Sequence, residues 1–281
     1  MDFNGRFAVY VREDRFTSDP KFGALMSEFR TAGIRTYPVA CKNDLQPDTS
    51  MLLSVGGDGT FLTAASLVED TGIPVLGVNL GRLGFLSENS PQDICQAIVS
   101  GNFDIENRTL LRAEILPETE GNAIRDWPYA LNEFTVHRSG AATLGVNVSI
   151  DGNRLPAYWS DGLLVATSSG STAYSLSVGG PIVLPDSRVL IISPIAPHNL
   201  NVRPLIVPDT SSVEISFVSR DEKVLFTADN RNAEISADAR IFISMARFSL
   251  KRVRLNSSNF INALTGKLFW GEDIRNGNSQ F

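Results

Sequence analysis

Residues 51–60 read MLLSVGGDGT, a short apolar run followed at once by a glycine-rich turn. The run 51–55 has the length and composition of a buried strand, and a helical pattern of apolar residues resumes at 61–68. A strand, a glycine turn and a helix in this order form the basic unit of α/β proteins. The turn then lies at the carboxyl end of the strand, where ligands usually bind in such sheets.

The same alternation extends over the first hundred residues. Strand-like runs occur at 7–11 and 73–78, and helical patterns occur at 21–32 and 91–100. Strands that alternate with helices favour a parallel sheet with helices on its faces. We therefore expect residues 1–103 to form an α/β domain with an open, mostly parallel sheet.

The pattern changes after about residue 103, where short alternating or β-branched stretches replace the helices. They lie at 111–116, 134–137, 146–150, 189–192, 213–218 and 241–244. Asp151-Gly152 follows one of them and is a strong hairpin signal. A long helical pattern returns only at 259–268. The prediction is a β-rich second domain over 104–259, with 260–281 as a segment able to pack back on the first domain.

Composition limits the classes of partner. The chain has 281 residues, a hydrophobic fraction of 43% and a formal net charge of −6, without a basic run. Nucleic-acid binding needs a concentrated basic surface, so we expect no nucleic-acid partner. Two cysteines far apart in sequence favour a reducing compartment. The first residues lack the pattern of a signal peptide, and no window approaches the roughly 18 apolar residues of a membrane helix. We expect a cytoplasmic protein that does not bind membranes.

The glycine turn has the residue types of a phosphate site. Gly56, Gly57 and Gly59 let the backbone approach a phosphate closely, and the following helix offers free amide groups. Asp58 would repel bare phosphate, so it fits a carboxylate that holds Mg²⁺ or accepts a proton. The alternative is a tight turn in which Asp58 bonds its own backbone. The Walker A and G-x-G-x-x-G signatures are absent, which argues against P-loop kinases and dehydrogenases.

A second constellation occupies residues 161–181, which read DGLLVATSSGSTAYSLSVGGP. An apolar run leads into a block rich in hydroxyls and glycine, which can recognise ribose and carboxamide groups without carrying charge. The alternative is a Ser/Thr-rich loop between strands. No G-x-S-x-G motif supports a serine hydrolase. The two histidines, His137 and His198, are expected to be structural.

Together these residues resemble the NAD kinase family, whose pattern is a Gly-Gly-Asp-Gly loop, an Asn-Glu pair and an Asp-Gly…Gly-Ser-Thr-Ala-Tyr-Ser-Leu-Ser segment ending in Gly-Gly-Pro. This sequence has 56–60, Asn132-Glu133 and 161–181 in the family's order and roughly its spacing. Supporting matches lie at 79–86, 193–198, 203–205 and 267–271. The glycine loop alone also occurs in lipid kinases and phosphofructokinases, whereas the 161–181 block is specific. The resemblance implies the two-domain fold of that family, with 104–259 as its NAD-binding domain.

The resemblance also implies roles for individual residues. Asp58 would be the catalytic acidic residue and a metal ligand, and Gly59 would pack against the nucleotide. Asn132 and Glu133 would bind the adenine and ribose part of NAD, and Asp161 would contact its nicotinamide side. The remaining residues implied to bind the dinucleotide are Phe85, Ser169, Thr172, Ala173, Tyr174, Ser175, Leu176 and Ser177. Phe85 has an alternative interpretation as a core aromatic residue.

Three positions depart from the family's pattern. Thr167-Ser168-Ser169 stands where Thr-Pro-Thr is frequent, so the loop loses a rigid proline. Asp229-Asn230-Arg231 stands where Asp-Gly-Gln is frequent, which puts a ligand contact there in doubt. Thr63 stands where a basic residue is frequent, which leaves Arg82 and Arg138 as candidates to neutralise the phosphates.

The implied reaction is an in-line displacement at the γ-phosphorus of ATP by the 2'-hydroxyl of the adenosine ribose of NAD, which yields NADP. Phosphoryl transfer has a loose transition state, so positioning and charge neutralisation contribute more than strong base catalysis. Asp58, with an ordinary pKa of about 3.9, would accept the proton late and help to hold Mg²⁺.

Two other functions are alternatives at this stage. A lipid or sugar kinase would share only the glycine loop and would not need Asn132-Glu133. A catalytically silent NAD-binding sensor would have no need of Asp58 as a base. The resemblance implies a homo-oligomer, a dimer or a tetramer. The sequence leaves open whether polyphosphate replaces ATP, whether NADH replaces NAD, and whether products regulate the enzyme.

Overall fold

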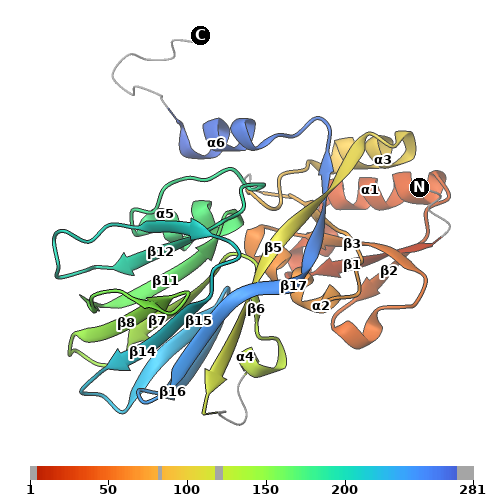
Figure 1. Cartoon of the computed structure of the whole chain (residues 1–281). Coiled ribbons are helices and arrows are strands. Elements are labelled where there is room, and N and C mark those ends of the chain that lie inside the picture. The colour runs from red at the N-terminus through yellow and green to blue at the C-terminus, as the bar shows by residue number, and fades with distance from the viewer. Residues whose placement is uncertain (1–4, 82–83, 118–122, 271–281) are drawn as a thin grey trace. The chain divides into compact units, whose positions relative to one another are not determined.

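The computed structural model describes residues 5–81, 84–117 and 123–270, and the chain divides into two compact units. The first unit joins Met1–Glu106 to Lys251–Phe281, and the second is Asn107–Leu250. Two long strands run from one unit into the other, β5 (Phe103–Leu116) and β17 (Arg240–Leu255) (Figure 1). The first unit is therefore assembled from both ends of the chain.

The first unit contains a parallel sheet with the strand order β2-β1-β3-β4, and the last part of β17 adds to β4. The predicted α/β architecture is confirmed. Its elements are β1 (Arg6–Val11), η1 (Asp14–Ser18), α1 (Pro20–Thr31), β2 (Thr36–Val39), η2 (Lys42–Asp44), β3 (Thr49–Val55), α2 (Asp58–Val68), β4 (Val75–Val78), α3 (Pro91–Ser100) and α6 (Phe260–Leu268).

The core of this unit follows from the alternation of side chains along the strands. Met51 and Leu53 of β3 are fully buried in one cluster with Phe29 of α1 and Ile94 of α3. Leu52 between them points to the other face of the sheet. Helix α2 contacts β3 and β4 and has buried apolar residues, but none of them is part of that cluster. Helices on both faces bury the sheet on both sides, so near-continuous apolar strands are expected.

The second unit contains two antiparallel sheets, with strand orders β13-β12-β11-β7-β15-β16 and β10-β8-β14-β17. The expected β-rich architecture is confirmed. Its further elements are α4 (Ala123–Asp126), β6 (Tyr129–Ala130), β7 (Glu133–Arg138), β8 (Leu144–Ile150), β9 (Asn153–Arg154), β10 (Tyr158–Ser160), β11 (Gly162–Thr167), η3 (Ser169–Thr172), α5 (Tyr174–Ser177), β12 (Val189–Ile195), β13 (Leu205–Pro208), β14 (Val213–Val218), β15 (Lys223–Ala228) and β16 (Arg231–Ser236).

Alternate residues of these strands form the core of the second unit. Phe134 of β7 and Val165 of β11 share one buried cluster with Val146 of β8. The other face of β11 carries Leu164 and Ala166, which form a smaller cluster. Tyr174, Val178 and Val183 pack against that smaller cluster, so the hydroxyl-rich block lies over the outer face of β11 and β12.

The hairpin predicted at Asp151-Gly152 is confirmed. Residues 151 and 152 have φ values of 50° and 81°, and they join β8 to β9 with Ile150 opposite Asn153. A two-residue turn with both φ values positive matches the right-handed twist of the strands.

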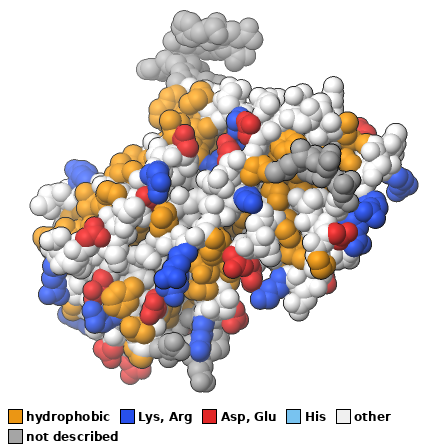
Figure 2. Space-filling model, turned by 45° about the vertical axis from the view of Figure 1, so that its right-hand side comes forward, with side chains coloured by type: hydrophobic (Ala, Val, Ile, Leu, Met, Phe, Trp, Pro, Cys, Tyr) orange, Lys and Arg blue, Asp and Glu red, His pale blue; other side chains and the backbone are white. Residues whose placement is uncertain are grey.

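Charged side chains of both signs are distributed over the surface. In Figure 2, basic and acidic side chains are interspersed on the face shown, with no continuous basic area there. This distribution agrees with the formal charge of −6. In the described ranges, no helix combines the length and the apolar composition needed to cross a membrane.

Candidate active site

The glycine loop joins β3 to α2 at the carboxyl edge of the parallel sheet. Helix α2 begins at Asp58, inside the predicted loop, and its N-cap residue Gly57 offers no side chain to cap the first turn. Gly57 and Gly59 are exposed. Gly56 has a φ of 146°, and a Cβ there would lie 2.5 Å from Oγ1 of Thr60, so only glycine fits. The exposed, uncapped start of α2 has the arrangement that binds anions.

The carboxylate of Asp58 is held by four donors. Its Oδ2 accepts the backbone N–H of Phe85 at 2.9 Å, and its Oδ1 accepts those of Leu86 at 3.0 Å and Ser87 at 2.9 Å. The ammonium of Lys267, on α6, lies 3.3 Å from Oδ2. Burial alone would raise the pKa of Asp58, but the amide hydrogen bonds and Lys267 outweigh it and lower that pKa. The carboxylate is therefore ionised and strongly anchored.

This anchoring bears on the roles predicted for Asp58. A carboxylate offers about four lone-pair positions, and the four donors occupy them. Among the described residues there is no group of three or more His, Cys, Asp or Glu side chains that could hold a metal ion. Mg²⁺ is commonly held by substrate phosphates with one or two carboxylates. The catalytic and metal-binding roles of Asp58 stay predictions.

Phe85 connects the 84–87 turn to the C-terminal helix. Its ring is 9% exposed, lies 4.4 Å from the ammonium of Lys267 and is 5.8 Å from the ring of Phe260. A Cβ at Gly84 would lie 2.0 Å from Oδ1 of Asp58, so the turn approaches the carboxylate too closely for a side chain. Sequence analysis did not single out Lys267 itself, although the matched motif at 267–271 begins with it.

In the second unit, Asp229 plays the same anchoring role for the Asn132-Glu133 pair. Its carboxylate accepts the backbone N–H groups of Leu131 at 2.8 Å, Asn132 at 2.8 Å and Glu133 at 3.2 Å. Asp229 has a φ of 50°, a conformation that Asp tolerates better than most residues. The guanidinium of Arg231 donates to the carbonyls of 127 and 129. In this segment, which departs from the family's pattern, Asp229 and Arg231 therefore shape the backbone that presents Asn132.

Glu133 is an acid held in its neutral form. The residue is 8% exposed, and its Oε2 has no hydrogen-bond partner in the described part of the chain. Burial, followed by the charge of Asp229, raises the pKa of Glu133 to about 8, although a backbone hydrogen bond from Tyr174 works in the opposite direction. At neutral pH the carboxyl carries a proton, so it can donate a hydrogen bond as well as accept one.

The hydroxyl-rich block is tied to the same loop through Thr167. Its backbone N–H donates to the carbonyl of Asn132 at 2.8 Å, and its hydroxyl donates to that of Leu131 at 2.6 Å. The hydroxyl also accepts the N–H of Gly170 at 3.1 Å. A Cβ at Gly170 would lie 2.3 Å from the carbonyl oxygen of Asn132. Thr167 and Gly170 thus hold the block against Asn132, a role that sequence analysis did not assign.

Other hydroxyls of the block serve the fold. Ser168 donates to the carbonyl of Pro185 at 2.9 Å, and Ser171 exchanges hydrogen bonds with the backbone of Val183. Of these two anchors, Ser168 stands where the family often has a proline. The hydroxyls of Ser169 and Ser175 are buried without a partner among the described residues. Thr172, Ala173, Tyr174 and Leu176 are partly buried and Ser177 is exposed.

Asp161 and Arg138, which sequence analysis considered separately, form an ion pair. Nε of Arg138 lies 2.6 Å from Oδ1 of Asp161. The ring of His137 stacks on Tyr174 with centroids 5.9 Å apart, and burial lowers its pKa while Asp161 opposes that shift. Arg138 is thus committed to a carboxylate of its own unit, and the other candidate, Arg82, lies outside the described residues.

Both units match known domain families. Residues 13–100 match the ATP-NAD kinase N-terminal domain, and residues 131–255 match the ATP-NAD kinase C-terminal domain. The chain belongs to the ATP-NAD kinase family. The resemblance inferred from the motifs is confirmed. An NAD kinase of Flavobacterium psychrophilum is 38% identical over 262 residues, covering 92% of this chain and 88% of that protein. An NAD kinase of Porphyromonas gingivalis is 39% identical over 245 residues, covering 85% and 83%.

Solved structures of this kinase family share the fold. The structure of yeast NADH kinase complexed with NADH matches with a TM-score of 0.81 and 24% identity, covering 97% of this chain and 90% of that one. An NAD kinase from Archaeoglobus fulgidus in complex with ATP matches with a TM-score of 0.74 and 25% identity, covering 94% and 98%.

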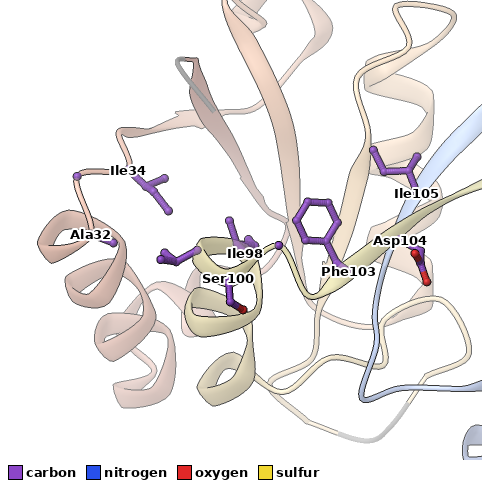
Figure 3. A pocket seen from close by; sticks show the side chains of 10 residues that line it. Ala32, Ile34, Ile98, Ser100, Phe103, Asp104 and Ile105 are labelled. Atoms are coloured by element: carbon purple, nitrogen blue, oxygen red, sulfur yellow. The ribbon is translucent and has the colours of Figure 1, made fainter. Parts of the chain in front are cut away.

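A hollow of about 720 Å³ in the first unit lies away from the kinase motifs. Ile34, Ile98 and Phe103 line it, together with the ends of α1 and α3 (Figure 3). Residues 32–34 lead into the start of β2, whereas the glycine loop follows the end of β3, which runs parallel to it in the sheet. The hollow is therefore at the opposite edge of the sheet from the glycine loop.

Proposed function

We propose that this chain is an enzyme that transfers the γ-phosphoryl group of ATP to the 2'-hydroxyl of the adenosine ribose of NAD, producing NADP. The observation that carries the proposal is the family match over both units, which includes the glycine loop and the 161–181 block. Complexes of similar proteins with ATP and with NADH support a nucleoside triphosphate and a dinucleotide as substrates. A lipid or sugar kinase would not account for the match of the second unit.

In this reaction the exposed start of α2 receives the phosphates of ATP, which enters as its magnesium complex. The ribose oxygen bonds to the γ-phosphorus while the bond between that phosphorus and the ADP oxygen breaks, and the hydroxyl proton passes to Asp58 as the ammonium of Lys267 gives up its place on Oδ2. Because the pKa of Asp58 is lowered, Asp58 is a weak base. Its main contribution is to position the reacting hydroxyl and to accept the proton late. Neutral Glu133 and Asn132 would hydrogen-bond the adenosine part of NAD.

The other predicted residues keep their proposed roles. Gly59 and Phe85 contact the nucleotide, and Asp161 contacts the nicotinamide side. The dinucleotide also meets Ser169, Thr172, Ala173, Tyr174, Ser175, Leu176 and Ser177. Thr172, Ala173, Tyr174 and Leu176 are partly buried and Ser177 is exposed, which supports access for the dinucleotide.

We also propose a homo-oligomer in the cytoplasm. Exposed apolar side chains on the edge strand β13, Leu205 and Ile206, support association between copies. The two free cysteines, Cys41 and Cys95, support a reducing compartment. Light scattering after size-exclusion chromatography distinguishes a monomer from a dimer or tetramer.

The test of the reaction is NADP formation from NAD and MgATP, read by coupling to an NADP-specific dehydrogenase. Polyphosphate and NADH are run as alternative donor and acceptor. Strong signal with NAD and MgATP is expected. Silence from folded protein that still binds NAD would instead indicate the NAD-binding sensor, and silence without NAD binding would require another acceptor.

The Asp58→Asn variant tests the central residue. We expect the rate to fall by orders of magnitude, because the charge and the proton acceptor are both lost. The amide NH₂ would also face the donors that Oδ2 now accepts, which costs about 1–3 kcal/mol of stability. A thermal unfolding curve must therefore accompany the rate. Near-wild-type turnover in this variant would show that the proton goes elsewhere.

A further inference from the structure

The proposed donor carries several negative charges, and the glycine loop has no cation of its own. Thr63, on the first turns of α2, uses its hydroxyl to donate to the carbonyl of Gly59 at 3.2 Å. Arg138 is paired with Asp161 in the other unit. Positive charge beyond that of the bound magnesium can come from other described side chains next to the loop.

Arg12 is one cation beside the loop. It directly follows β1, whose neighbour in the sheet is β3, so it shares the carboxyl edge with the glycine loop. A Cβ at Gly59 would lie 3.8 Å from Nη1 of Arg12, which places the guanidinium over this glycine. Arg12 is exposed and forms no ion pair with the described residues. Its charge is therefore available to a ligand on the loop.

Lys267 is a second cation, next to Asp58. Its ammonium lies 3.3 Å from Oδ2 of Asp58 and 4.4 Å from the centre of the Phe85 ring. These two contacts fix its position next to the first residue of α2. The side chain is 34% exposed, so the ammonium keeps donors free beyond the one that faces Asp58.

We propose that Arg12, beside Gly59, and Lys267, beside Asp58, bind the phosphate groups of the ATP donor. The inference rests on the proposed function, since it specifies how that donor is held. The uncapped amides of α2 bind the phosphate oxygens between the two cations. Lys267 comes from α6, the last helix among the described residues, and Arg12 follows β1, so the donor site draws on segments far apart in the sequence.

The test compares Arg12→Met, Lys267→Met and the double variant with the wild type. A charge-assisted hydrogen bond to phosphate is lost in each, so KM for MgATP should rise about tenfold or more. KM for NAD should change by less than about threefold, on the same scale. Binding of tripolyphosphate, measured by calorimetry, should weaken in parallel, whereas binding of adenosine should not. Arg12→Lys and Lys267→Arg should recover most of the affinity.

Lys42→Met is the matched control. Lys42 also pairs with a carboxylate of the first unit, Glu69 at 3.1 Å, and that carboxylate is 28% exposed, as Asp58 is. Its loss should leave KM for MgATP unchanged. Arg12→Met removes no ion pair or side-chain hydrogen bond within the described residues, so it stays informative if Lys267→Met unfolds. Unchanged affinity for MgATP and tripolyphosphate in folded Arg12→Met would overturn the inference.

The outcomes also separate the inference from the proposed function. A wild type that forms NADP, with variants that keep their MgATP affinity, refutes the two cations alone. If the wild type forms no NADP but the variants lose tripolyphosphate binding, NAD is refuted as the acceptor, and the phosphate-binding role of the two cations stands.

Discussion

Replacing Glu133 by glutamine should remove a large pH-dependent term from the stability of the second unit. The pKa of this buried carboxyl is raised from 4.5 to about 8. Between these values the folded chain holds a proton that the unfolded chain has released. The stability associated with the neutral carboxyl is therefore complete below pH 4.5, falls as the pH rises, and is lost above the folded pKa. Glutamine resembles the protonated acid and does not titrate.

The magnitude follows from the shift. Each pKa unit corresponds to about 1.4 kcal/mol, so the ionised form costs the folded state about 5 kcal/mol in full. This cost lowers the free energy of unfolding by roughly 1.4 kcal/mol at about pH 5.5 and by nearly the full amount at about pH 8.5. As the pH rises between these two values, the free energy of unfolding of Glu133→Gln should therefore increase by about 3 kcal/mol relative to that of the wild type.

The assay is urea unfolding of both proteins at the two pH values, followed by circular dichroism and tryptophan fluorescence. The buried amide NH₂ lacks a partner, as Oε2 does, and this adds a constant penalty of about 1–3 kcal/mol. Only the change of the gap with pH is diagnostic. Glu234→Gln is the control, because Glu234 lies exposed on β16 and pairs with Lys223.

A stability gap between wild type and Glu133→Gln that stays constant within about 1 kcal/mol from about pH 5.5 to 8.5 would contradict this prediction. Glu133 would then be ionised at neutral pH, and it could not donate a hydrogen bond to the adenosine part of NAD.

Two further predictions concern glycines that face site residues. Gly84→Ala would put its Cβ 2.0 Å from Oδ1 of Asp58, so we expect a loss of about 1–3 kcal/mol in stability and at least tenfold in kcat, measured by thermal unfolding and NADP formation. Gly170→Ala would put its Cβ 2.3 Å from the carbonyl of Asn132, and it should raise KM for NAD while leaving KM for MgATP unchanged. Gly23→Ala on α1, with nothing within 4 Å of the new Cβ, should retain activity and be slightly more stable; equal losses in all three variants would contradict both predictions.

Much of the fold could be predicted because local patterns agree with it. The apolar run at 51–55 became β3, the helical pattern at 91–100 matched α3, and the Asp151-Gly152 turn formed its hairpin. β17 was predicted only at 241–244, although it extends to Leu255. Its later residues include Arg252, whose buried guanidinium is paired with Glu88 and Glu106. A buried ion pair interrupts the apolar pattern, so the sequence reads as polar there.

The candidate site was predictable in its motifs but not in its contacts. The glycine loop and the 161–181 block stand out by composition. In contrast, Asp58 accepts hydrogen bonds from backbone amides 27 to 29 residues away in the sequence, and Asp229 accepts them from amides 96 to 98 residues away. Such pairings depend on the tertiary fold, which one sequence does not encode in any short pattern. They also weaken one inference from sequence, since an NAD-binding sensor would still need Asp58 to hold its 84–87 turn.

The two-part construction of the first unit has a consequence for the order of synthesis. The second unit is one continuous segment, Asn107–Leu250, and all of its strand partners have been made once β17 emerges from the ribosome. The first unit waits for its last strand beside β4 and for α6, which brings Lys267 to Asp58. A nascent chain released early would therefore carry a finished β-rich unit and an incomplete glycine-loop site, so the capacity to bind the donor arrives only with the final helix.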